Sequence, residues 1–183
     1  GGTVVHINAG IAALVGCIVI GKRIGYGKEN MAPHSMVMTM IGASMLWVGW
    51  FGFNVGSNLE ANGGATLAMF NTFVATAAAT LAWSALEGLQ RGKASMLGAA
   101  SGMVSGLVAI TPACGTVGPM GAIALGVIAA AGCYFFVTVV KNKMKYDDSL
   151  DVFGIHGVGG IIGAVLTGVF SAAAFGGVKG DDY

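Results

Sequence analysis

Six long apolar runs, separated by short segments that carry nearly all the charge, constrain this chain more than any other feature. The runs cover residues 4–21, 36–57, 65–86, 96–111, 117–140 and 152–175. Most approach the ~20 residues that a helix needs to cross ~30 Å of hydrocarbon. They lack the alternation of a transmembrane barrel. We therefore expect a single all-α domain, a polytopic transmembrane helix bundle, over residues 1–183.

The composition supports an integral membrane protein and argues against a soluble or nucleic-acid-binding protein. Only 9% of the residues are charged, against about 25% in an average soluble chain. The net charge of +1 provides no basic field for nucleic acid. The three cysteines have no CxxC spacing and are typical of small apolar positions. We expect no metal or other cofactor, and the lipid bilayer as the surrounding medium.

The basic residues predict how the chain is oriented. Eight of the nine Lys and Arg residues fall in three connecting loops, at residues 21–34, 87–95 and 141–151, and the ninth, Lys179, follows the last run. The positive-inside rule makes these three loops cytoplasmic. We therefore expect a multi-pass protein of the cell (plasma or inner) membrane with both ends extracytoplasmic. The first residues have neither an initiator Met nor signal-peptide features, which favours a fragment of a longer membrane protein.

A histidine motif occurs twice inside the apolar runs. HINAGIAALVG from His6 and HGVGGIIGAVL from His156 both fit H-x-x-[AG]-G-I. The two copies lie five runs apart, so their helices cross the membrane in opposite directions. Opposed copies are the signature of an inverted repeat, in which the site lies near the midplane. The third histidine, His34, falls in a predicted loop and is interpreted as solvated.

Ionisable residues inside a span are candidates for function. The competing interpretation is a structural hydrogen bond to a neighbouring helix. Two neutral rings can share one N–H···N bond and leave each ring another nitrogen for a ligand. Each histidine lies close to the edge of its run, so we expect the rings to meet only if the first helix begins before Gly1 and the last begins back in the segment 147–151.

The second run ends in MLWVGWFGFNVGS, with Trp50, Phe53 and Ser57 at i, i+3 and i+7 on one helical face. An interfacial aromatic belt is one interpretation. The other is the mouth of a pore, because aromatic faces attract cations and a hydroxyl oxygen accepts a hydrogen bond from a cation that has an N–H. Ammonium is such a cation, whereas potassium is not.

Across its whole length the sequence resembles the Amt/Mep/Rh ammonium transporters, on the Amt side. The matching segments are GGTVVHINA, GKRIGYGKE, GWFGFNVGS, NTFVATAAA, RGKASMLGA, GLVAITPACG and DDSLDVFGIHGVGG. The resemblance implies an eleven-span fold with an inverted repeat of five plus five spans, of which this chain would cover about the fifth to the tenth. It also implies a homotrimer with one pore per subunit, and a transporter or channel rather than an enzyme.

The resemblance assigns expected roles to particular residues. His6 and His156 match the twin histidines of the pore, Phe53 an outer gate phenylalanine, and Ser57 the serine that recruits ammonium. Trp50 matches a pore-lining tryptophan, and Asn54 and Thr111 match positions near the path. The other gate phenylalanine, an aromatic at the mouth and an aspartate are expected upstream of Gly1.

The expected activity is recruitment of ammonium outside and conduction of ammonia, with or without its proton, past the histidine pair. One alternative is an ammonium-sensing membrane domain coupled to signalling, and another is a di-histidine haem protein. A PII-type regulatory protein is a possible partner at the basic loops, whose charges otherwise only set topology. Asp147, Asp148 and Asp151 are expected to cap the last helix, with pore support by Asp148 or Asp151 as the alternative that the resemblance offers.

Overall fold

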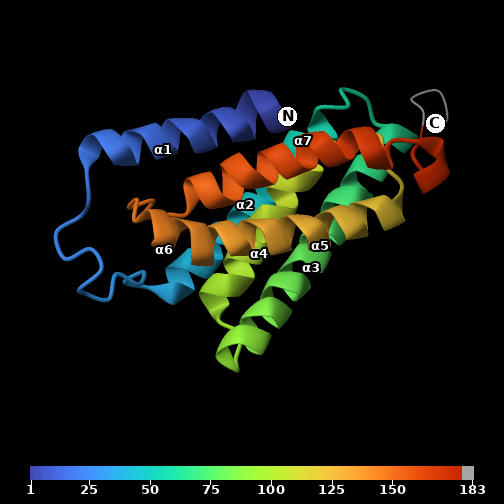
Figure 1. The fold of residues 1–183 in the computed structure, drawn as a ribbon. Helices are drawn as coiled ribbons and strands as arrows, with labels where there is room; N and C mark the ends of the chain where they lie inside the picture. Colours follow the sequence, from blue (N-terminus) through green and yellow to red (C-terminus); the bar gives the residue numbers. More distant parts are fainter. Residues whose placement is uncertain (179–183) are drawn as a thin grey trace.

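The computed structural model describes residues 1–178, which leaves Lys179 outside, and within that range the chain is built from helices without a strand (Figure 1). The helices coincide with the apolar runs. In chain order they are η1 (Gly2–Ile7), a π-helical turn continued by α1 (Asn8–Ile20); α2 (Met36–Gly56); α3 (Gly63–Arg91); α4 (Met96–Ile110); α5 (Pro119–Phe135), continued by η2 (Phe136–Val140) and α6 (Lys141–Met144); and η3 (Phe153–Gly157), continued by α7 (Val158–Phe170) and followed by the short 3-10 turn η4 (Ala173–Phe175).

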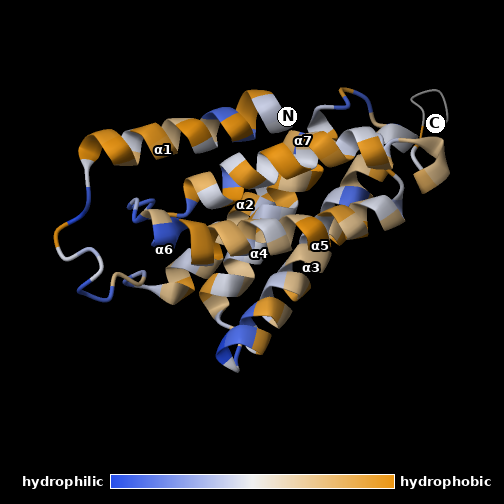
Figure 2. Cartoon of the chain, in the orientation of Figure 1, coloured by the Kyte–Doolittle hydropathy of each residue, from blue (hydrophilic) through white to orange (hydrophobic). Residues whose placement is uncertain are grey.

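Five of these continuous helices are long and apolar enough to cross a membrane, and α4 is a shorter apolar helix. Figure 2 shows apolar colour along the helices and hydrophilic colour mainly at their ends and in the loops. Large apolar side chains remain exposed on α1 and α2, among them Val15, Val19, Met45 and Val48. Exposed apolar surface of this extent indicates a face that water does not cover.

The helix starts follow from local sequence. Ser35, Asn62 and Ser95 are N-cap residues whose side-chain oxygens accept hydrogen bonds from the backbone N–H groups of Met38, Ala65 and Gly98. These bonds satisfy donors that have no partner inside the helix. Pro119 stands in the first turn of α5, where the N–H that it lacks is not needed.

Two helices extend further into the predicted loops than expected. The loop at residues 87–95 was expected to begin at Glu87, but α3 continues to Arg91, because Glu87 and Arg91 form an ion pair one turn apart and Gly92 ends the helix with φ +78°. The loop at residues 141–151 likewise begins only after Met144. At the other end of the chain, the last apolar helix ends at Phe170 rather than 175.

Small residues let the central helices α3, α4 and α5 pack with their backbones in close approach. A Cβ on Gly106 would lie 2.8 Å from the carbonyl oxygen of Ala75, and a Cβ on Gly126 would collide with the same carbonyl from the α5 side. Ala75 therefore lies where three helices meet. Such packing is typical of helices in lipid, where close van der Waals contact replaces the hydrophobic driving force.

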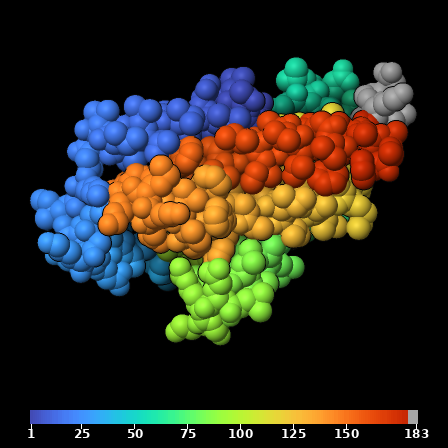
Figure 3. All heavy atoms as spheres, viewed as in Figure 1, coloured from blue at the N-terminus to red at the C-terminus, as the bar shows by residue number. Residues whose placement is uncertain are grey.

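The basic loops lie at one end of the bundle. The segment after α1 bonds the segment before η3, and a cavity between α3, α4 and α6 is lined by both Arg91 and Lys141. Figure 3 shows the chain near residue 25 beside the chain near residue 145. At the opposite end, Val178 N–H donates to the Thr116 carbonyl, in the loop that lacks Lys and Arg. The fold thus places the three loops that carry Lys and Arg at one end of the bundle and the loop at residues 111–118 at the other.

Candidate functional site

The two histidines of the repeated motif are in contact. The Nδ1 atoms of His6, on η1, and His156, on η3, lie 3.3 Å apart, and the ring centroids lie 5.5 Å apart. His6 is buried and His156 is partly buried. The expected approach of the ring nitrogens to hydrogen-bond distance is therefore present.

The expected reason for this contact was wrong at the last helix. That helix does not begin in the segment 147–151. Its first turn starts at Val152, where the Asp148 carboxylate accepts hydrogen bonds from the N–H groups of Val152 and Phe153. Asp151 has φ +55° and interrupts the helix on its N-terminal side. The non-helical segment 145–151 lies beside the C-terminal half of α1. The chain before His156 therefore extends along α1 as a loop, where additional helical turns were expected.

The glycines of the two motif copies explain how the helices approach so closely. A Cβ on Gly10 would collide with the backbone of Gly157, the residue after His156. In the other copy, a Cβ on Gly160 would lie 3.0 Å from the Ile7 side chain, the residue after His6. The glycine four residues after each histidine thus packs against the residue that follows the other histidine. This reciprocal contact is the local form of the two-fold relation between the copies.

Aromatic rings from α2 enclose His6. The indole of Trp50 stacks on the imidazole with centroids 5.2 Å apart and an interplanar angle of 11°. Phe53 presents its ring at 6.1 Å and 82° to the same imidazole. Both contacts come from one face of α2, as the spacing i, i+3 predicts. The packing fixes the plane of His6 before any ligand is present.

Thr111, directly after α4, links these groups. Its hydroxyl oxygen lies 2.9 Å from Trp50 Nε1, 3.3 Å from His6 Nε2 and 2.7 Å from the Leu107 carbonyl oxygen. A hydroxyl has one hydrogen and two acceptor positions. The carbonyl can only accept, so the hydroxyl donates to Leu107 and accepts from the indole and from His6.

These contacts assign hydrogens to both imidazoles when the rings are neutral. His6 carries its hydrogen on Nε2, because that atom donates to Thr111, so its Nδ1 is an acceptor. His156 must then donate from Nδ1 to His6 Nδ1, at 3.3 Å. Its own Nε2 is left as an acceptor that no other side chain bonds within the described residues 1–178. The network therefore ends in one unused lone pair, on His156. The expectation that each ring keeps a nitrogen for a ligand is wrong for His6, because its Nε2 bonds Thr111.

Both histidines line an apolar groove of about 720 Å³ between η1, α1 and α2. Its other walls are Val5, Ala9, Gly42, Met45, Leu46, Gly49, Trp50 and Phe53. The sequence argument named Trp50 and Phe53 but missed the aliphatic residues. Their helical spacing relative to His6 and Trp50, such as Leu46 four residues before Trp50, is the signal that identifies them.

Three expected site residues do not line this groove: Thr111, which bonds Trp50 and His6, and the residues Asn54 and Ser57. Asn54 is buried between α2 and α3, where its amide donates to the Thr72 hydroxyl at 3.1 Å. Ser57 is exposed at the end of α2, and its hydroxyl donates to the Phe53 carbonyl at 2.6 Å. With its hydrogen used in this way, the Ser57 oxygen can only accept a hydrogen bond. It therefore suits a ligand that carries an N–H or O–H donor.

Comparison with known proteins gives a consistent result. The model of the family described as Ammonium Transporter Family matches residues 1–181. The ammonium transporter of Aquifex aeolicus is 55% identical over 180 residues, which cover 98% of this chain and 42% of that protein. The ammonium transporter of Bacillus subtilis is 47% identical over 176 residues, covering 95% of this chain and 43% of that protein.

Solved structures agree with the sequence relatives. The crystal structure of Candida albicans Mep2 matches with a TM-score of 0.87 and 37% identity, over 96% of this chain and 39% of the Mep2 chain. A structure described as a sensor Amt protein matches with a TM-score of 0.89 and 30% identity, over 96% of this chain and 44% of that chain. The chain thus spans less than half the length of each of these four proteins.

Proposed function

This chain belongs to the ammonium transporter family and is a multi-pass membrane protein, and on that basis we propose that it forms part of an ammonium conduction path. The part that it forms is the one that contains the histidine pair. The single observation that carries the proposal is the contact between His6 and His156, both of which line an apolar groove. The remaining length of such a transporter would cover the open side of the groove and close the pore.

The physical difficulty of ammonium transport is the charge. A cation at the centre of a bilayer costs about 2.5–3.5 kcal/mol even by the lower experimental scales. Ammonium can avoid that cost by releasing a proton, whereas potassium cannot. An apolar groove therefore favours ammonia and rejects potassium. The groove walls are aliphatic and aromatic apart from the two imidazoles, which fits this demand.

The proposed path begins at the outer end of α2. Ser57 accepts a hydrogen bond from ammonium, and the ring faces of Phe53 and Trp50 stabilise its charge. At the outer mouth the cation transfers its proton to a water molecule, and ammonia enters the apolar groove with or without that proton following it. Ammonia then passes the histidines, where the Nε2 lone pair of His156 accepts one of its N–H groups. Asn54 supports this path from the α2–α3 interface, and Thr111 fixes the orientation of His6.

The same proposal includes orientation and partners. The three basic loops face the cytoplasm, and both ends of the segment face outside. The protein is a homotrimer, and a PII-type regulator docks on the basic loops. Lys22 and Lys145, which line one cavity at that end of the bundle and form no ion pair within residues 1–178, support that docking surface.

Two alternatives are weaker. An ammonium sensor would bind the same ligand without substantial flux, and the likeness to a sensor Amt structure is the observation in its favour. A di-histidine haem protein needs the macrocycle between its axial ligands. The rings of His6 and His156 instead contact each other directly, which is incompatible with that arrangement.

The test replaces each histidine in the full natural chain. His6→Ala and His156→Ala, reconstituted in liposomes, are expected to lower ammonium flux or to admit potassium. His34→Ala is the matched control, because His34 lies in the exposed loop after α1 and is the third histidine of the segment. Flux and potassium exclusion equal to the control in both variants would refute the role of the pair. Specific ammonium binding without flux in the unmodified protein would favour the sensor.

A further inference from the structure

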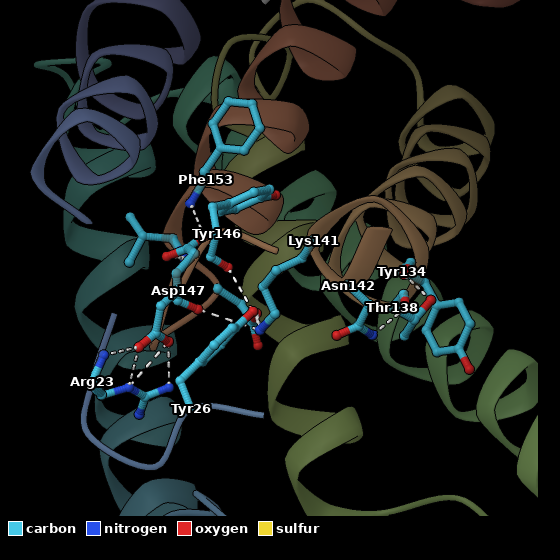
Figure 4. Close-up of polar contacts among 12 residues, drawn as sticks. Arg23, Tyr26, Tyr134, Thr138, Lys141, Asn142, Tyr146, Asp147 and Phe153 are labelled. Atoms are coloured by element: carbon cyan, nitrogen blue, oxygen red, sulfur yellow. Dashed lines mark hydrogen bonds and ion pairs between the residues drawn. The ribbon is translucent and has the colours of Figure 1, made fainter. Parts of the chain in front are cut away.

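The loop 145–151, which precedes the helix that carries His156, is held by three aspartates that each bind a different element. Figure 4 shows the polar contacts of this region. Asp147 binds Arg23, in the segment after α1. Asp148 caps the first turn of the last helix, whereas the same role expected of Asp147 and Asp151 was wrong, because basic side chains bind their carboxylates. Asp151 forms an ion pair with Lys141 of α6. The loop thus joins the ends of two helices to the beginning of a third.

The contact of Asp147 with Arg23 is the most extensive of these. The carboxylate accepts hydrogen bonds from the Arg23 backbone N–H at 2.8 Å, from Nε at 2.9 Å and from a terminal guanidinium nitrogen at 2.7 Å. The Asp147 side chain is 2% exposed. A forked guanidinium contact fixes orientation as well as distance. The Arg23 guanidinium also holds the pKa of the Asp147 carboxyl below its usual range.

A second contact binds the same two segments. The Tyr26 hydroxyl donates to the Tyr146 carbonyl at 3.1 Å. The Tyr146 ring in turn packs edge-on against Phe153, with centroids 6.1 Å apart. Its hydroxyl is buried, and this burial raises the pKa of the phenol to about 12. Phe153 lies one helical turn before His156. The segment after α1 is therefore connected to the turn that carries the second histidine.

At the crossing point, the helix interface does little to fix the relative position of the two histidines along their axes. Gly10 there faces Gly157 without a side chain on either residue. At this point two glycine surfaces permit close approach but provide no interlocking side chains, which are what normally set the register of packed helices; the Ile7 side chain packs on Gly160 about one turn away. The bonds between the two segments lie at the end of α1 and at the beginning of the last helix, where they resist sliding.

We propose that Arg23 is a positioning residue for the histidine pair: through Asp147 it holds the loop 145–151 to the end of α1 and thereby sets the distance between His6 and His156. This inference rests on the proposed conduction function of the pair. Without the ion pair, the last helix can shift along α1, and the Nδ1–Nδ1 contact lengthens.

The test uses Arg23→Gln in the full natural chain, reconstituted in lipid. Lys22→Gln is the matched control, since Lys22 is the preceding residue and packs over the Tyr26 ring without binding Asp147. The readout is the nitrogen–nitrogen correlation across the histidine contact, measured by solid-state NMR on ¹⁵N-histidine protein. We expect the correlation to be weakened or lost in R23Q and kept in K22Q. Because misplacement by ~1 Å can cost ~100-fold in a positioned reaction, we expect flux in R23Q to fall by about tenfold or more.

Further variants separate positioning from general damage. Asp147→Asn should reproduce the R23Q result, and the double variant should lose no more than either single one, because the two residues act as one unit. If R23Q does not fold, Arg23→Lys keeps the charge without the fork and should give an intermediate correlation. A correlation and flux equal to the K22Q control in R23Q, or in R23K where only that variant folds, would overturn the positioning role. If neither histidine variant affects flux, the proposed function fails instead.

Discussion

Thr111→Val tests the hydrogen-bond network around His6, and the expected loss in the free energy of unfolding can be worked out from the structure. Valine keeps the shape of the side chain but removes the oxygen that accepts from Trp50 Nε1 and His6 Nε2. Each buried donor left without a partner costs about 1–3 kcal/mol. The indole bond, at 2.9 Å, should count fully, whereas the longer imidazole bond, at 3.3 Å, should count at the lower end. We expect a loss of about 2–4 kcal/mol in the free energy of unfolding.

Thr76→Val is the matched control for this variant. Thr76 is fully buried in α3, and its hydroxyl donates to the Thr72 carbonyl four residues earlier, as Thr111 does to Leu107. Thr76 accepts no bond from another side chain within the described residues. The difference between the two variants therefore isolates the acceptor role of Thr111.

The assays are reversible unfolding in mixed micelles and ¹⁵N NMR of the histidines. Without the Thr111 acceptor, His6 is free to move its hydrogen to Nδ1, which reverses the direction of the bond with His156. Mixed tautomers and reduced ammonium flux are therefore expected. If Thr111→Val is no more destabilising than Thr76→Val, to within about 0.5 kcal/mol, and the His6 tautomer is unchanged, the assignment of hydrogens is refuted.

Two further predictions concern the helix contact and the charged loops. Gly10→Leu should separate the helices that carry the two histidines, because a Cβ at this position collides with Gly157. We expect loss of the NMR nitrogen–nitrogen correlation between His6 and His156. The control Gly16→Leu, where a Cβ meets open space, should keep that correlation. The Asp147 carboxyl has a lowered pKa in the fold because of Arg23, so its contribution to stability is present above the unfolded pKa of about 3.9 and is lost as pH falls through the folded value. The difference in unfolding free energy between the unmodified protein and Asp147→Asn should thus stay constant from pH 7 to about 5 and shrink below about 4; a difference that shrinks already near neutral pH would contradict the assigned ion pair.

Much of the fold follows from local sequence. The positions of the helices are set by continuous apolar length, and several starts are set by caps such as Ser35 and Asn62. The errors occur where a tertiary contact changes a boundary. Glu87 looks like the first loop residue because it is charged, yet it is buried and bonded to Ser95. A charged residue whose carboxylate is hydrogen-bonded by its neighbours can remain inside a helix, although a prediction from hydropathy alone would end the helix there.

For the candidate site, helical periodicity predicts which residues share one face of α2 but not which of them contact His6. The spacing of Trp50 and Phe53 correctly predicts that both face one side of α2, and both contact His6. The same spacing continues to Ser57, which lies beyond the helix and whose hydroxyl donates to the Phe53 carbonyl one turn earlier. Spacing defines a face but not what the face contacts, so it could not separate the groove residues from the exposed hydroxyl.

The sequence by itself determined the membrane class, the gathering of the basic loops at one end of the bundle, and the two histidines as a pair to be compared. These properties depend on length, hydropathy and charge, which are additive along the chain. Only the tertiary structure decided how the rings meet. Gly10 and Gly157 admit the close crossing, Thr111 fixes the hydrogen positions, and a loop rather than a helix brings His156 to the level of His6. Each of these depends on contacts between residues far apart in the chain, and such contacts are not additive in sequence.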